Sequence, residues 1–184
     1  MRRIAFQGIP GAFSEAAALR LWGSCEPLPQ ASFTSVVEVV ESGAALGGVL
    51  PIENSIAGQV SESLAALRGS RSIEISDRLT LPVRLHLLGL PGATQAQVRR
   101  VASHPIALAQ CSEFLASLGD SEITAWFDTA GAARDVARAG DPCFAAIAGQ
   151  VAGEHYGLRV LAFDVHNPPP PENVTEFVAI RRRP

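Results

Sequence analysis

Polar side chains follow two apolar stretches of the sequence, at the points where loops are expected to begin. The run GVLPIENS places Glu53, Asn54 and Ser55 directly after hydrophobic residues, and VRRVASHP does the same with Ser103 and His104. Open α/β sheets bind ligands at the carboxyl ends of their strands. Such groups suit a small ligand held by hydrogen bonds, although Asn and Ser also commonly satisfy backbone groups within turns. The pattern alone leaves both interpretations open.

The stretch ENVTEFVAI, residues 172–180, mixes strand-forming residues with polar ones near the end of the chain. Asn173 and Thr175 stand where a buried strand favours hydrocarbon. Because side chains alternate between the two faces of a strand, Asn173, Thr175 and Phe177 should share one face. Glu176 should then point to the opposite face. We predict that this strand brings Thr175 to a ligand site.

A third polar loop, GIPGAFSE, follows the first apolar strand. Its glycines permit tight turns and close approach of a ligand to the backbone, so Gly11, Ala12 and Phe13 are candidate contacts. The loop is neither GxGxxG nor a P-loop with its lysine, so a nucleotide site is not indicated. An ordinary strand–helix turn remains the alternative.

Two helices are expected to begin at hydroxyl residues and to present free backbone amides. Ser103 is the predicted N-cap of the helix that contains Gln110, and Thr129, followed by Ala130, that of the helix in FDTAGAA. Helix N-termini attract anions through these amides and the helix dipole. The sequence therefore predicts a site for a small organic anion. Gln110 fits a surface position equally well, and His104 fits a structural role.

Composition excludes several other kinds of chemistry. The net charge is −3 and the pI about 5.8, which argue against a general nucleic-acid or anionic-membrane binder. All 15 basic residues are arginines, so a lysine Schiff base is excluded. Cys25, Cys111 and Cys143 are widely separated, without zinc-ligand spacing, and are expected to be reduced thiols of a cytoplasmic protein. No stretch approaches the ~20 apolar residues of a membrane span.

Strands and helices alternate along the chain, which predicts an α/β fold with parallel strand pairing. A strand is expected in RRIAFQG, and helices are expected to begin at Ser14 and at Thr34 or Ser35. The segment 73–90 is extended, with Pro82 in its middle, and is too long to remain in one sheet.

We interpret the segment 73–90 as a crossing between two lobes, with the chain returning after residue 162. One lobe is expected to comprise residues 1–80 and 163–184, and the other residues 81–162. Clefts between lobes are favoured sites for small ligands. The polar loops described above are therefore expected to meet in such a cleft.

Taken in order, the segments GIPGAFSEAAA, GVLPIENSIAGQV, VASHPIALAQCSEFL, DTAGAA, AAIAGQVAGEHYGLRVL and NVTEF resemble the prephenate dehydratase family over nearly the whole chain. The resemblance implies a two-lobed α/β fold like that of type II periplasmic binding proteins. It also implies loss of water and carbon dioxide from prephenate, giving phenylpyruvate on the route to phenylalanine. No cofactor and no metal are implied, and a homodimer is expected.

The resemblance assigns the catalytic role to Thr175, which falls on the threonine of the family's T-R-F motif. A threonine hydroxyl is a very weak acid, so it would donate a hydrogen bond within a relay to the departing ring hydroxyl. The groups expected to hold the substrate are Gly11, Ala12, Phe13, Glu53, Asn54, Ser55, Ser103, His104, Gln110, Thr129, Ala130, Asn173 and Phe177.

Two positions depart from the family pattern. T-R-F appears as TEF, with Glu176 in place of arginine, and the glutamine expected after S-H-P is Ile106. If Glu176 points away from Thr175, its exchange alters only packing or a salt bridge, which we favour. Alternatively, Glu176 meets the ammonium group of arogenate, the transaminated analogue of prephenate.

Other functions remain open at this point. They are a prephenate decarboxylase, against which Thr175 argues, and a non-catalytic module that binds small anions, since this architecture often only binds ligands. Because the chain stops at Pro184, we expect no ACT regulatory module and no inhibition by phenylalanine through one.

Overall fold

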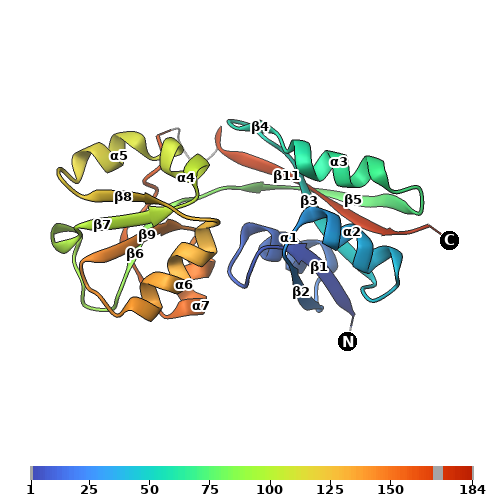
Figure 1. Ribbon diagram of the computed structural model, residues 1–184, viewed down its shortest axis with the longest axis horizontal. Helices are drawn as coiled ribbons and strands as arrows, with labels where there is room; N and C mark the ends of the chain where they lie inside the picture. Colours follow the sequence, from blue (N-terminus) through green and yellow to red (C-terminus); the bar gives the residue numbers. More distant parts are fainter. Residues whose placement is uncertain (1, 168–171, 184) are drawn as a thin grey trace. The chain divides into compact units, whose positions relative to one another are not determined.

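The computed structural model describes residues 2–167 and 172–183, which form two compact units (Figure 1). Unit 1 contains residues up to Ile9, Phe13–Pro82 and the segment from Asn173 onward. Unit 2 contains Pro10–Ala12 and Val83–Glu172. Each unit combines a sheet with helices, so the predicted α/β class is confirmed.

Unit 1 is built on a six-stranded sheet in the order β2-β1-β3-β11-β5, with β4 added to β3. β1 is parallel to both β2 and β3, whereas β11 runs antiparallel between β3 and β5 (Figure 1). The strands are β1 (Arg3–Gln7), β2 (Glu26–Gln30), β3 (Gly47–Asn54), β4 (Gly58–Gln59), β5 (Ile73–Pro82) and β11 (Val174–Arg182).

Three helices accompany this sheet: α1 (Phe13–Trp22), α2 (Phe33–Glu41) and α3 (Ser61–Gly69). α2 begins at a capping box in which Ser32 is the N-cap and Ser35 the reciprocal partner, slightly earlier than predicted. α1 also begins earlier than predicted, and Ser14 lies buried inside it. The expected start positions were therefore off by one to three residues in sequence, while the helices themselves were predicted correctly.

The core of unit 1 follows the alternation of β11. Phe177 packs in one cluster with residues of α1, such as Ala17 and Ala18. Val178 and Ile180 belong to another cluster, with residues of α2 and neighbouring strands. The two faces of β11 therefore pack against different helices, and Thr175 shares the face of Phe177.

Unit 2 has a five-stranded sheet in the order β10-β6-β9-β7-β8. β7 is parallel to β8 and β9, whereas β6 is antiparallel to β9 and β10. The strands are β6 (His86–Gly89), β7 (Arg100–Ser103), β8 (Glu122–Ala125), β9 (Phe144–Ala148) and β10 (Arg159–Ala162).

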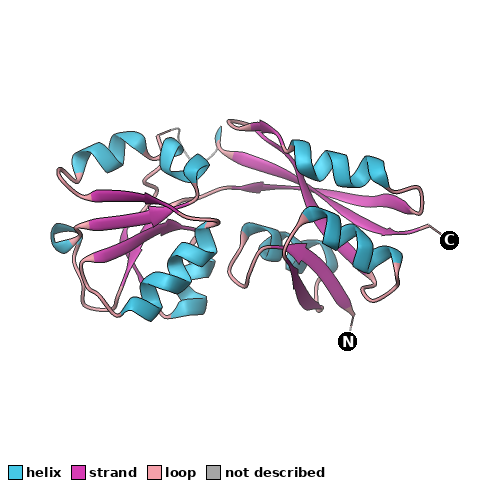
Figure 2. Cartoon of the chain, in the orientation of Figure 1, coloured by secondary structure: helices cyan, strands magenta, loops and turns pink. Residues whose placement is uncertain are grey.

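The helices of unit 2 are α4 (Pro105–Gln110), α5 (Ser112–Ser117), α6 (Thr129–Ala139) and α7 (Gln150–Tyr156), with a 3₁₀ turn at Gln95–Gln97 (Figure 2). The sequence predicted one helix where α4 and α5 stand. The chain instead breaks at Cys111, whose φ of −116° and ψ of 18° are not helical. α4, α6 and α7 directly follow the parallel strands β7, β8 and β9, so they begin at the same edge of the sheet.

The residues that follow β10 pack within unit 2, although the predicted boundary gives them to the first lobe. Val165 N–H donates to the Leu85 carbonyl at 2.9 Å, and Asn167 N–H donates to the Gln110 carbonyl at 2.6 Å. Arg84 forms a two-pronged ion pair with Asp164, whose φ is +50°. The bonds of Leu85 and Arg84 tie the segment that leaves unit 2 to the segment that enters it, and the bond of Gln110 ties the leaving segment to the end of α4.

Candidate active site

Thr175 lies beside a carboxamide at the end of the β3–β11 pair. The register places Thr175 directly opposite Asn54, so the two side chains share one face of the sheet. Asn54 Nδ2 lies 2.9 Å from Thr175 Oγ1, 3.0 Å from Asn173 Oδ1 and 3.1 Å from the Val174 carbonyl. The structure therefore brings together Asn54, Asn173 and Thr175, three of the polar residues that the sequence analysis singled out.

The oxygen of the Asn54 amide also forms hydrogen bonds within the protein. Its Oδ1 accepts hydrogen bonds from the backbone N–H groups of Ile56 at 3.0 Å and Ala57 at 2.8 Å. These donors fix which end of the amide is oxygen, since a flipped amide would place N–H groups against them. The two Nδ2 protons face three acceptors, so Asn54 has no donor left over. It orients its neighbours, and its expected contact with substrate stays a prediction.

The hydroxyl of Thr175 is positioned as an acceptor and keeps its own proton. Thr175 is largely buried, with 8% of its surface exposed. A hydroxyl has one proton and two lone pairs, and the Asn54 amide occupies a lone pair. Among residues 2–167 and 172–183, no hydrogen-bond acceptor for the Thr175 proton is found. The proton can therefore be donated to a bound molecule.

Ser55 fastens the end of β3 to β11. Its N–H donates to the Val174 carbonyl at 2.9 Å, and its hydroxyl accepts from the Val174 N–H at 3.0 Å. This reciprocal pair holds the backbone immediately before Thr175. Ser55 is exposed, so a contact with substrate stays a prediction.

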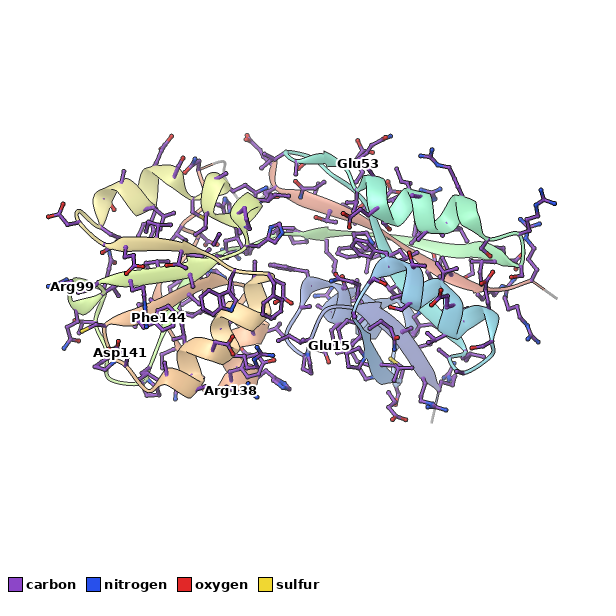
Figure 3. The ribbon with its side chains drawn as sticks, viewed as in Figure 1. Glu15, Glu53, Arg99, Arg138, Asp141 and Phe144 are labelled. Atoms are coloured by element: carbon purple, nitrogen blue, oxygen red, sulfur yellow. The ribbon has the colours of Figure 1, made fainter. Side chains whose placement is uncertain are left out.

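Glu53 and Glu176 face away from Thr175. They stand opposite each other in the register, one position along from the Asn54–Thr175 pair, so both lie on the other face of the sheet. Glu176 is held by Arg78 of β5 at 2.7 Å. Figure 3 shows Glu53 at the end of the sheet that carries β4, and its side chain is exposed. This placement separates Glu53 from Asn54 and Thr175, and its expected contact with substrate stays a prediction.

The two aromatic residues expected at the ligand site of unit 1 contribute to its core. Phe177 is 2% exposed and packs with Ile4 and Val49. Phe13 is partly buried against the same cluster. Phe177 anchors the strand that carries Thr175, and its expected role as a wall of the site stays a prediction.

Ser103 and His104 have exchanged the roles that the sequence suggested. Ser103 is fully buried, and its hydroxyl donates to the Ile147 carbonyl at 2.6 Å, which ties β7 to β9. His104 is the N-cap of α4, and its Nδ1 accepts from the Ile106 N–H at 3.2 Å. The prediction that Ser103 caps this helix was wrong, because its hydroxyl satisfies a buried carbonyl instead.

The N-terminus of α6 already holds a carboxylate. Asp128 is the N-cap and accepts from the Gly131 N–H, so Thr129 is the first helical residue and not the predicted cap. Burial raises the pKa of Asp128, and the Gly131 N–H and Arg134 oppose that rise. Ala130 is buried within the helix. A second anion at this helix end would meet the Asp128 carboxylate.

The remaining predicted groups are placed as follows. Gln110 is mostly buried at the end of α4. Gly11 and Ala12 belong to unit 2, although α1, which begins at the next residue, belongs to unit 1. Tyr156 contacts this loop and was missed, because a single aromatic residue near the end of a helix carries no sequence signal of such a contact. Asp128 could have been found, since Asp is a favoured N-cap.

Within residues 2–167 and 172–183, no cluster of three or more His, Cys, Asp or Glu side chains could hold a metal ion. In the same part of the chain, no helix has both the length and the apolar character needed to cross a membrane.

The sequence profile of the family described as prephenate dehydratase matches residues 4–184. The chain belongs to the prephenate dehydratase family. The resemblance indicated by the ordered motifs is therefore confirmed.

Individual relatives agree with this assignment. Arogenate dehydratase/prephenate dehydratase 1, chloroplastic, of Arabidopsis thaliana is 41% identical over 182 residues, which are 99% of this chain and 45% of that protein. The chain thus spans less than half the length of this relative. Prephenate dehydratase from Arthrobacter aurescens in complex with L-Phe superposes with a TM-score of 0.89 at 27% identity, covering 99% of this chain and 61% of that one.

A further solved structure is described as GqqA, a novel type of quorum quenching acylase. It superposes with a TM-score of 0.89 at 37% identity, and the match covers 100% of this chain and 65% of that one. The same fold is therefore associated with more than one described activity.

Proposed function

We propose that this chain catalyses the decarboxylating dehydration of prephenate to phenylpyruvate, and so is a carbon–oxygen lyase in phenylalanine biosynthesis. Membership of the family supports this proposal. The observation that carries it is the Thr175 hydroxyl, which accepts from Asn54 at 2.9 Å and retains a proton to donate.

The reaction needs a proton at the oxygen of the ring hydroxyl, which leaves as water. The bond from the ring to its carboxylate breaks and releases carbon dioxide, and the electron pair moves into the ring. The bond to the ring hydroxyl then breaks, and the departing oxygen takes a proton to leave as water. Thr175 would donate a hydrogen bond to that oxygen. The proton that the oxygen takes up would come from solvent, through a relay of hydrogen bonds that includes the Thr175 hydroxyl. The Asn54 amide polarises the Thr175 O–H, because hydrogen bonds in a chain strengthen one another.

Incubation of the chain with prephenate, with phenylpyruvate followed over time, tests the proposal. Thr175→Ala should lower kcat by on the order of 100-fold, which is typical of losing a positioned proton donor. Thr175→Ser should retain most of the turnover, since it keeps the hydroxyl. Thr80→Ala is a matched control: Thr80 is an exposed threonine on the neighbouring strand β5, opposite Glu176. Equal turnover in Thr175→Ala and Thr80→Ala would remove Thr175 from the mechanism.

Prephenate is the proposed substrate, in preference to arogenate. The name of the Arabidopsis relative includes both activities. However, Glu176, the acidic residue that could have met the ammonium group of arogenate, is engaged by Arg78 on the face opposite Thr175. Comparison of kcat/KM for the two compounds decides between them. A higher value for arogenate that falls in Glu176→Gln would replace prephenate with arogenate.

Two other outcomes would replace the proposal as a whole. Release of an amine from an N-acyl amide, without turnover of prephenate, would favour an acylase like the one described for the solved relative. Saturable binding of prephenate in calorimetry, without any product, would favour a binding module.

We also propose a cytoplasmic homodimer. The three separated, unpaired cysteines support a reducing compartment. The assembly follows only from the resemblance to the family. Light scattering of the purified chain across a range of concentrations would test it, and a monomer mass throughout would contradict it.

A further inference from the structure

The loop between β1 and α1 belongs to unit 2, although both elements that it connects belong to unit 1. Pro10–Ala12 groups with unit 2, while Ile9 and Phe13 group with unit 1. This grouping reflects specific contacts between the loop and residues of unit 2.

Gly11 makes the first of these contacts. Its φ is +91°, a conformation that residues with a Cβ rarely adopt. A Cβ at this position would lie 2.8 Å from the Cα of Ala152 and 3.1 Å from its Cβ. Ala152 is fully buried in the first turn of α7. Glycine is therefore required twice, by the backbone conformation and by the close approach to α7.

Tyr156 makes the second contact. Its hydroxyl donates to the Pro10 carbonyl at 2.7 Å. Tyr156 is the last residue of α7 and is half-buried. It stands four residues after Ala152, so both side chains lie on the same side of the helix. Two independent contacts from a single helix face thus hold the backbone on both sides of the Pro10–Gly11 peptide.

We propose that Ala152 and Tyr156 form a seat that holds Pro10–Ala12 in the conformation that meets the substrate, with Tyr156 as a positioning residue. This inference rests on the proposed function and on the expectation that the backbone around Gly11 approaches the ligand. A loop that is already fixed loses less conformational freedom when the substrate binds. The seat therefore acts mainly on substrate affinity.

Tyr156→Phe removes only the hydroxyl, so the fold should be retained. Loss of one hydrogen bond should raise KM for prephenate about fivefold. kcat should change by less than about twofold, because the lost contact favours bound substrate and transition state alike. Tm should remain within a few degrees of the parent value. A KM equal to that of the parent, with or without a fall in Tm, would show that Tyr156 serves only the fold and would overturn the proposal.

Gly11→Ala tests the other half of the seat against a matched control. Gly119, in the same unit, also has a positive φ, of +66°, but a Cβ there would meet nothing within 4 Å. Both substitutions impose backbone strain, and only Gly11→Ala blocks the approach to Ala152. KM should rise more than tenfold in Gly11→Ala and less than twofold in Gly119→Ala. Equal effects of the two substitutions would overturn the proposal.

A readout independent of catalysis is available, because Tyr156 is the only tyrosine of the sequence. Incorporation of 3-fluorotyrosine gives one fluorine resonance that reports on the seat. It should shift in Gly11→Ala and stay in place in Gly119→Ala. An unshifted resonance in Gly11→Ala would refute the contact between the Pro10–Ala12 loop and α7. If the parent chain fails to turn over prephenate while the resonance still shifts as expected, the proposed function fails and the contact stands.

Discussion

Asn54 offers the sharpest test of how Thr175 is activated. The two Nδ2 protons of Asn54 can make two hydrogen bonds at a time, and its Oδ1 accepts two more. Asn54→Ala therefore deletes up to four simultaneous hydrogen bonds, which at about 1 kcal/mol each would total about 4 kcal/mol. Water can replace the side chain at the N–H groups of Ile56 and Ala57, because both residues are exposed. The expected loss of stability is therefore about 2 kcal/mol. In urea it should lower the unfolding midpoint by about 1 M, with the slope m unchanged.

Turnover should separate Asn54→Ala from Asn54→Asp. Asn54→Ala leaves the Thr175 proton free but removes the bond that orients and polarises the hydroxyl, so kcat should fall about tenfold. Asn54→Asp keeps the acceptor for Ile56 and Ala57 but turns a carboxylate oxygen toward Thr175 Oγ1. The hydroxyl would then donate to that carboxylate, and kcat should fall by about 100-fold or more. Its activity should partly recover in acid, because the protonated carboxyl again donates toward Oγ1.

Steady-state kinetics with prephenate, measured beside urea titrations, provide the assay. Asn167→Asp is the control, since Asn167 also donates through Nδ2 to a hydroxyl, that of Ser112, at 2.8 Å in unit 2. Turnover in the control should stay within twofold of the parent. If Asn54→Asp matches or exceeds Asn54→Ala in kcat, the orientation of the Thr175 proton is not what Asn54 contributes.

Three further predictions concern charge and reactivity. Arg78→Ala should lower the free energy of unfolding by less than about 1 kcal/mol in low salt, because its pair with Glu176 is exposed; a larger loss in urea titrations would contradict this. Burial raises the pKa of Cys111 to about 12, so mass spectrometry after iodoacetamide at pH 8 should find it unmodified while half-buried Cys143 is alkylated; the reverse order would contradict the burial. The pKa of Asp128 is raised by burial, so the folded state binds more protons than the unfolded state, and stability should fall as pH rises above the ordinary value of 3.8. Asp128→Asn keeps a favoured cap and should lose this decline in denaturation curves across pH; an unchanged decline would assign it to another group.

Predictions from the sequence were most accurate where the two-residue alternation of a strand, or another local signal, decides the structure. The alternation of ENVTEF correctly predicted that Thr175 and Phe177 share a face and that Glu176 does not, because successive strand side chains point to opposite faces. The predicted helix starts were displaced by one to three residues. At α4 two adjacent residues could serve as the cap, and a tertiary bond chose between them: Ser103 bonds to Ile147 and leaves His104 as the cap.

The rest depends on contacts between residues far apart in the chain. The Tyr156–Pro10 bond joins residues 146 positions apart, and no local pattern encodes it. The break between α4 and α5 at Cys111 carries neither Gly nor Pro, the usual signals for a helix end. The internal use of the Asn54 amide likewise depends on a strand that arrives 121 residues later.

The charged face behind Thr175 carries a consequence for how related sequences vary. Residue 176 lies between Glu53 on β3 and Arg78, near Thr80, on β5. An acidic residue there pairs with Arg78, whereas the arginine of the family motif would pair across the strand with Glu53 and repel Arg78. Positions 176 and 78 should therefore covary in charge among relatives. Thr175, on the other face of the same strand, should stay constant through each such exchange.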